Sequence, residues 1–201
     1  MIQTIFGSPV VVINADSPEL FPNDLYNEIV DYLMSPENKD VDHPYTRGGK
    51  ICTTDLNSTI KEKIDRVGSL LDFLKKIGLK YAHLYSDKHI TDLKFDNMWI
   101  NITFQGCEIK NHYDRYDEYT EKTLIILFYP KAPTGGSNLV FMHNSEYGDW
   151  PSEQSESNLV KIRIESGDIV IMDNHVLHGV DTHNTPEPRM CVATEFKIET
   201  N

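Results

Sequence analysis

The 201-residue sequence lacks the usual signs of a secreted, membrane-spanning or zinc-stabilised protein. Its three cysteines, Cys52, Cys107 and Cys191, are odd in number and show no CxxC spacing, which argues against a disulfide framework and a structural zinc site. The N-terminus has no basic start, apolar stretch and cleavage site of a secretory signal, and no segment approaches the length of a membrane span. We therefore expect a soluble protein with reduced cysteines, located in the cytoplasm of a cell or of an infected host.

Positive charge is also scarce. The chain has 19 lysines and arginines against 31 aspartates and glutamates, which gives a formal net charge of -12 at pH 7. A protein of this charge repels a phosphate backbone at long range, so non-specific binding to nucleic acid is not expected. The acidic residues are spread along the chain rather than gathered in one block, which is typical of a solvated surface.

The length and composition favour a single folded domain over residues 1–201. The hydrophobic fraction of 39% and the aromatic fraction of 10% suit a globular core, and the chain contains no repeat or low-complexity segment. The character of the sequence changes near residue 95. We expect a helical support over roughly residues 1–94 and a β-rich core over roughly residues 95–201.

The first part predicts one strand and two helices. A β-branched run predicts the strand Pro9–Ile13. A loop rich in Asp, Pro and Gly, from Ser35 to Lys50, separates the helices. The second helix is expected to begin at a capping box formed by Thr59 and Glu62 and to stop at Gly78. Apolar residues recur at helical spacing in both helices, at Leu25, Ile29, Tyr32 and Leu33, and at Ile60, Ile64, Val67, Leu71, Leu74 and Ile77.

From Phe95 onward the chain breaks into short β-rich runs separated by turn residues. The predicted strands are Asn97–Phe104, Thr123–Tyr129, Asn138–Met142, Leu159–Ile164, Asp168–Met172 and Met190–Ile198. Short strands at this spacing indicate a β-sandwich or jelly roll, so the fold class is mostly β with supporting helices. The open mouth of such a barrel can hold a small ligand, and the chemistry is expected there.

Two side chains that can bind a metal follow the first of these strands. His112 and Asp114 are two residues apart, and side chains at this spacing in an extended segment project to the same side. A third ligand from another strand would complete a set of two histidines and one carboxylate. His178, with Gly179 beside it to permit a close backbone approach, is the best candidate. His175 flanks the same turn, and periodicity does not choose between the two histidines.

These residues form part of a longer ordered pattern. It resembles the iron(II)- and 2-oxoglutarate-dependent oxygenases, in which an HxD triplet is followed by a glycine turn, a strand that begins with Gly-Asp, a histidine with Gly-Val, and an arginine. The matching segments here are His112-Tyr113-Asp114, Gly135-Gly136, Ser166–Met172, His178-Gly179-Val180 and Arg189. The start of the chain and Trp99-Ile100-Asn101 also resemble short phage and bacterial oxygenases. The resemblance selects His178 rather than His175.

The resemblance implies a role for each of these side chains. His112, Asp114 and His178 would hold iron(II), and Arg189 would bind the far carboxylate of 2-oxoglutarate. Asn101, on the strand before the HxD triplet, would also contact oxoglutarate. The fold implied is a double-stranded β-helix, which is a jelly roll. The activity implied is hydroxylation of an unreactive C–H bond, with oxoglutarate and O2 as cosubstrates.

The substrate is less well defined by the sequence. Residues 112–118 resemble the iron-binding segment of prolyl 4-hydroxylases, which favours a peptidyl proline. Collagen-modifying prolyl hydroxylases, however, anchor oxoglutarate with a lysine, where this chain has Arg189. A free amino acid, another protein side chain or a nucleobase therefore remain alternatives.

Two other classes of function also fit a metal-binding barrel. One is a cupin-like binding module that oxygenates nothing, and the other is an isomerase or hydrolase that uses His112 and His178 with a different ion. Arg189 argues against the binding module, because an arginine that points into the barrel is costly unless a partner such as a dicarboxylate compensates its charge. The segment 143–158, with Tyr147 and Trp150, is expected to form either part of a lid over the site or a plain surface loop.

Overall fold

The computed structural model describes residues 1–15, 46–47, 51–55, 64–114, 123–143 and 158–201, together with residues 24, 27 and 31. The apolar residues of the first predicted helix, most of the loop Ser35–Lys50 and the capping box at Thr59 and Glu62 lie outside this part of the chain. In the described segments, no helix has the length and apolar character needed to cross a bilayer.

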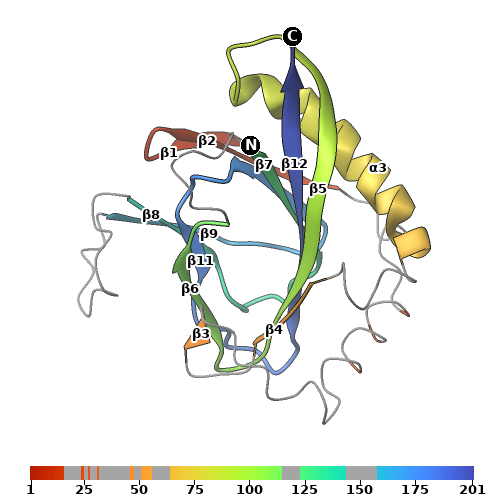
Figure 1. Cartoon of the computed structure of the whole chain (residues 1–201). Coiled ribbons are helices and arrows are strands. Elements are labelled where there is room, and N and C mark those ends of the chain that lie inside the picture. The colour runs from red at the N-terminus through yellow and green to blue at the C-terminus, as the bar shows by residue number, and fades with distance from the viewer. Residues whose placement is uncertain are drawn as a thin grey trace.

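Two antiparallel sheets form the body of the molecule (Figure 1). The larger sheet contains, in spatial order, β1 (Ile2–Ile5), β2 (Ser8–Asn14), β10 (Asp168–Asp173), β7 (Thr123–Lys131), β12 (Arg189–Thr200), β5 (Ile90–Thr103) and β4 (Ile51–Asp55). The smaller sheet contains β3 (Thr46–Arg47), β6 (Glu108–His112), β11 (His178–Val180), β8 (Leu139–Met142) and β9 (Leu159–Ile162). Strands adjacent in space are mostly distant in sequence, as in a jelly roll.

Strand β7 shows how the larger sheet separates two cores. Successive side chains of a strand point to opposite faces, and β7 is buried on both. Leu124, Ile126 and Phe128 belong to the core beneath the helix α3 (Ile64–Tyr81). Ile125, Leu127 and Tyr129 belong to the core between the two sheets. The near-continuous apolar sequence of this strand follows from this double burial.

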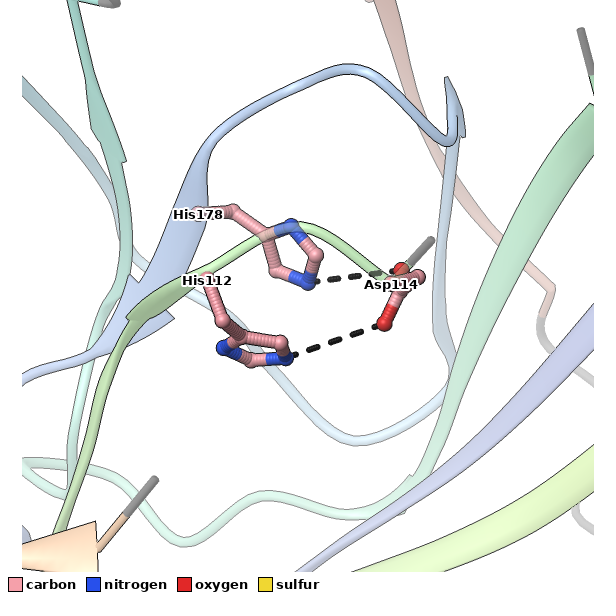
Figure 2. A group of neighbouring side chains, drawn as sticks. All are labelled: His112, Asp114 and His178. Atoms are coloured by element: carbon pink, nitrogen blue, oxygen red, sulfur yellow. Dashed lines mark ion pairs between the residues drawn. The ribbon is translucent and has the colours of Figure 1, made fainter. Parts of the chain in front are cut away.

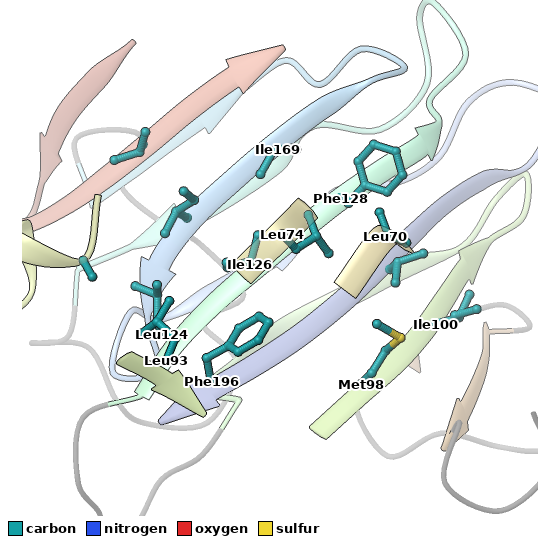
Figure 3. Packing of buried hydrophobic residues seen from close by; sticks show 14 of the residues in the cluster. Leu70, Leu74, Leu93, Met98, Ile100, Leu124, Ile126, Phe128, Ile169 and Phe196 are labelled. Atoms are coloured by element: carbon teal, nitrogen blue, oxygen red, sulfur yellow. The ribbon is translucent and has the colours of Figure 1, made fainter. Parts of the chain in front are cut away.

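Helix α3 packs on the outer face of the larger sheet (Figures 1 and 3). Leu70 and Leu74 are fully buried there, one turn apart. The predicted apolar stripe is therefore confirmed at Leu74, while Leu71 and Ile77 pack at the edge of this core. A short 3-10 helix, η3 (Ala82–Leu84), follows α3.

The predicted end of this helix at Gly78 is wrong, because α3 continues to Tyr81. Gly78 is required by packing rather than by a cap. A Cβ atom at this position would lie 2.8 Å from Cδ1 of Ile126 and 2.8 Å from Cδ1 of Leu93. A glycine therefore allows the helix to approach the sheet closely.

All six strands predicted in the second half exist, with ends that differ by a few residues. The main differences are β5, which begins at Ile90 rather than Asn97, and β12, which continues to Thr200. The structure adds β1, β3, β4, β6 and β11, which are short or polar and give little alternation for a sequence pattern to detect. β3 lies inside the segment that was expected to be a loop.

Candidate active site

The site forms where β6 ends and β11 begins. His112 is the last residue of β6 and His178 is the first residue of β11, and the two are direct partners in the antiparallel register. Gly179 makes this pairing close, as predicted. A Cβ on Gly179 would lie 2.7 Å from the carbonyl oxygen of Ile109 on β6. Only a residue without a side chain lets the two strands bring the histidines together.

Asp114 completes a cluster with the two histidines (Figure 2). Nε2 of His112 lies 3.7 Å from Oδ1 of Asp114, and Nε2 of His178 lies 3.6 Å from Oδ2 of Asp114. One donor atom from each residue lies within 4.8 Å of the others. Three donors at such separations could bind one metal ion together.

Backbone hydrogen bonds orient both imidazole rings. Nδ1 of His112 lies 2.9 Å from the carbonyl oxygen of Lys110, and Nδ1 of His178 lies 2.9 Å from the carbonyl oxygen of Val176. A carbonyl oxygen accepts only, so Nδ1 carries the proton in each neutral ring. Nε2 is then left with a lone pair that faces Asp114, which is the arrangement that metal-binding histidines need.

The electrostatics of the cluster keep Asp114 charged. Burial alone would raise the pKa of this carboxyl, but the neighbouring His178 and His112 hold it below its ordinary value. Burial lowers the pKa of His178, whereas at His112 the nearby carboxylate of Asp114 outweighs burial and raises the pKa. A divalent cation among these atoms would bind the neutral imidazoles and the charged carboxylate, which are the protonation states that metal binding requires.

His175, the alternative third ligand, lies outside the cluster. Its Nδ1 lies 3.6 Å from Oδ1 of Asp173, and its side chain is 37% exposed. His178, by contrast, has a side chain that is 6% exposed and directed at Asp114. The structure thus brings together the three residues that the resemblance selected.

A cavity adjoins the cluster and contains Arg189. This residue is 2% exposed, yet its Nε and Nη2 atoms have no hydrogen-bond partner in the described part of the chain. The guanidinium lies over the ring of Tyr129, with Cζ 4.5 Å from the ring centroid. Both side chains line the same cavity as His112, Asp114 and His178. A buried cation with two unused donors is costly unless an anionic ligand compensates it.

Asn101 lines the same cavity, as do three residues to which the sequence analysis assigned no role in the site: Trp99, Tyr129 and Cys191. Burial raises the pKa of the Cys191 thiol to about 12, and burial also holds the pKa of Tyr129 well above its ordinary value. The position of Cys191 follows from strand alternation. Arg189 and Cys191 lie two residues apart on one face of β12, where they pair with Thr103 and Asn101 of β5. Only this pairing of distant strands could have revealed that Cys191 lines the cavity.

The predicted lid falls largely outside the described residues. Only its two ends are described, where the backbone nitrogen of His143 donates a hydrogen bond of 3.2 Å to the carbonyl oxygen of Asn158. The lid itself, with Tyr147 and Trp150, stays a prediction.

No protein-family model and no curated protein sequence matches the chain. Solved structures do. A prolyl-4-hydroxylase from Pseudomonas putida superposes with a TM-score of 0.54 at 13% identity, over 94% of this chain and 92% of that chain. A viral collagen prolyl hydroxylase from Paramecium bursaria Chlorella virus-1, in complex with 2-oxoglutarate, superposes with a TM-score of 0.55 at 13% identity, over 93% of this chain and 94% of that chain. The epimerase SnoN, in complex with Fe3+ and alpha-ketoglutarate, superposes with a TM-score of 0.59 at 14% identity, over 93% of this chain and 78% of that chain.

These similarities define the fold. The chain has the jelly-roll, double-stranded β-helix fold of the 2-oxoglutarate- and iron(II)-dependent oxygenases, which confirms the fold predicted from the sequence. The residues present also fit the two groups that this class of fold implies. Two imidazoles and a carboxylate suit iron(II), and the unpartnered Arg189 suits a dicarboxylate.

Proposed function

We propose that this protein is an iron(II)- and 2-oxoglutarate-dependent oxygenase that hydroxylates an unreactive C–H bond. One observation carries the proposal: the His112, Asp114 and His178 cluster shares a cavity with a buried arginine that has two unused donors. A metal-binding barrel that does no oxygenase chemistry has no need of this arginine. A dicarboxylate cosubstrate supplies the negative charge that it lacks.

Each residue of the cavity has a physical role in this proposal. His112, Asp114 and His178 would hold the metal, and Arg189 would bind the far carboxylate of oxoglutarate through its planar fork. The ring of Tyr129 supports the guanidinium from one side. When bound, iron(II) and oxoglutarate supply the oxidation by O2: one oxygen atom enters the substrate as hydroxyl, the other enters succinate, and CO2 is released.

The test is succinate release coupled to product. Incubation with Fe(II), oxoglutarate, O2 and a substrate should give one succinate for each hydroxylated product. A cupin-like binding module or a metal-dependent hydrolase would bind the ion and release none. Metal binding without succinate, in the presence of a broad set of peptides, amino acids and nucleosides, would contradict the oxygenase assignment.

The preferred substrate class is a peptidyl proline. Two observations support it: the resemblance of residues 112–118 to prolyl 4-hydroxylases, and the presence of prolyl hydroxylases among the similar structures. Of that segment, only residues 112–114 are described. Incubation with proline-containing peptides should add one oxygen atom to proline. Oxygen found instead on free amino acids or nucleobases would replace this substrate class and leave the oxygenase chemistry intact.

A further inference from the structure

The cavity holds one nucleophilic group that the proposed reaction does not use, the thiol of Cys191. The side chain is 4% exposed and lines the cavity together with the metal cluster and Arg189. Its thiol is near enough to Tyr129 for a side-chain hydrogen bond, and the charges of Arg189 and Asp114 both act on it. Cys191 thus lines the same cavity as Arg189 and the metal cluster.

We propose that Cys191 is a self-oxidation site, at which the protein oxygenates its own thiol when oxoglutarate and O2 react without a substrate. The inference rests on the proposed oxygenase function. Sulfur is more easily oxidised than an aliphatic C–H bond, and this thiol lines the space in which the oxidising chemistry would occur. Its burial also shields it from oxidants in bulk solvent, which reach exposed cysteines first.

The reaction balances with the cosubstrates already named. The thiol, one oxoglutarate and one O2 give a sulfenic acid, one succinate and one CO2. Sulfur loses two electrons, the oxidative decarboxylation of oxoglutarate releases two more, and O2 accepts all four. One oxygen atom forms the new S–O bond, while the other becomes part of the succinate carboxylate. A second round of the same reaction gives the sulfinic acid, which is not readily reversed.

The oxidised side chain would then close the oxoglutarate subsite. A sulfinic acid is ionised at neutral pH, and Cys191 lies two residues from Arg189 on the same face of β12. The unused Nε and Nη2 donors of Arg189 would bind this new anion in place of a carboxylate. Oxygenase turnover without a substrate would therefore inactivate the protein by blocking its own cosubstrate.

The chain contains a matched internal control in Cys107. This thiol is 3% exposed, as buried as Cys191, but it packs in a separate small cluster with Ile109 and Val180 and does not line the cavity. An oxidant that diffuses through the protein would reach both thiols. Chemistry confined to the cavity would modify Cys191 alone.

The experiment measures the oxidation of Cys191 and Cys107 in the intact chain. The protein is incubated with Fe(II), oxoglutarate and O2, with catalase present and no added substrate, and its cysteine peptides are analysed by mass spectrometry alongside succinate. We expect Cys191 to gain one and then two oxygen atoms, Cys107 to stay unmodified, and anaerobic binding of oxoglutarate, measured afterwards by calorimetry, to be lost. The variant Cys107→Ser should behave as the parent does.

The outcomes separate this inference from the proposed function. Succinate formed with an unmodified Cys191 overturns the self-oxidation and leaves the oxygenase assignment standing. Equal oxidation of Cys107 and Cys191 overturns it as well, because the oxidant is then diffusible. If neither succinate nor oxidised cysteine forms, the self-oxidation is wrong, and the oxygenase assignment is decided separately by anaerobic binding of oxoglutarate before any exposure to O2.

Discussion

His112 and His178 are direct partners across the β6–β11 pair, with ring centroids 4.7 Å apart. Two segments separated by 66 residues thereby place two imidazoles beside one carboxylate. This contact joins the local pair His112 and Asp114 to a third ligand from a distant segment and so creates the candidate metal centre.

The first prediction concerns the metal ligands. Alanine at His112, Asp114 or His178 should abolish stoichiometric Fe(II) binding, because each removes a donor that the other two cannot replace. Calorimetry or anaerobic equilibrium dialysis measures this, and cooperative thermal unfolding shows that the variant is folded. His175→Ala is the matched control and should bind iron as the parent does. Loss of iron in His175→Ala, with tight binding kept in His178→Ala, would reverse the choice of ligand.

A second prediction concerns the close contact at Gly179. An alanine there would place its Cβ 2.7 Å from the carbonyl oxygen of Ile109 and separate β11 from β6. We expect weaker Fe(II) binding and a free energy of unfolding lower by about 1–3 kcal/mol, the usual cost of overpacking. Iron affinity equal to that of the parent would mean that the histidine pairing does not depend on this glycine.

The third prediction concerns the support of Arg189 by Tyr129. Tyr129→Leu should weaken oxoglutarate binding, since a cation over an aromatic face contributes about 0.5–2 kcal/mol. Tyr129→Phe should lose less of the oxoglutarate affinity, because phenylalanine keeps the aromatic ring. Phe128→Leu changes a similar volume on the opposite face of β7 and should leave oxoglutarate affinity unchanged. If Phe128→Leu and Tyr129→Leu weaken binding equally, the effect is one of general packing.

A fourth prediction contrasts two glycines of α3. Gly78→Ala should destabilise the protein by about 1–3 kcal/mol, because its Cβ would overlap Ile126 and Leu93. Gly68→Ala has no atom within 4 Å of its Cβ and should stabilise the protein by about 0.5–1 kcal/mol through helix propensity. Urea unfolding measures both. Changes of the same sign would contradict the packing assigned to Gly78.

The sequence predicts the fold class and the metal ligands because each is marked by a local pattern or by a series of motifs in a fixed order. The β-rich runs after residue 95 indicate a jelly roll, and the spacing of His112 and Asp114 places both on one side of an extended segment. Periodicity did not separate His178 from His175. The ordered resemblance did, and the structure brings His178 to the cluster.

Other features depend on packing between distant segments, which no local pattern encodes. Tyr129 and Cys191 look like ordinary residues of buried strands, and only the register of β7, β12 and β5 turns them toward the metal cluster. Gly78 has the sequence signature of a helix end, but the close approach of β5 and β7 is what requires a glycine there.

Arg189 gives the most direct test of the central claim, that the metal cluster and the buried arginine form one oxoglutarate site. Oxoglutarate is titrated anaerobically into the protein at fixed Fe(II), and binding is measured by calorimetry and by the visible absorption of the complex. We predict saturable binding at one oxoglutarate per iron. In Arg189→Met, iron binding should persist and oxoglutarate binding weaken by about 2–5 kcal/mol, with partial recovery in Arg189→Lys. Oxoglutarate affinity in Arg189→Met equal to that of the parent would contradict the account.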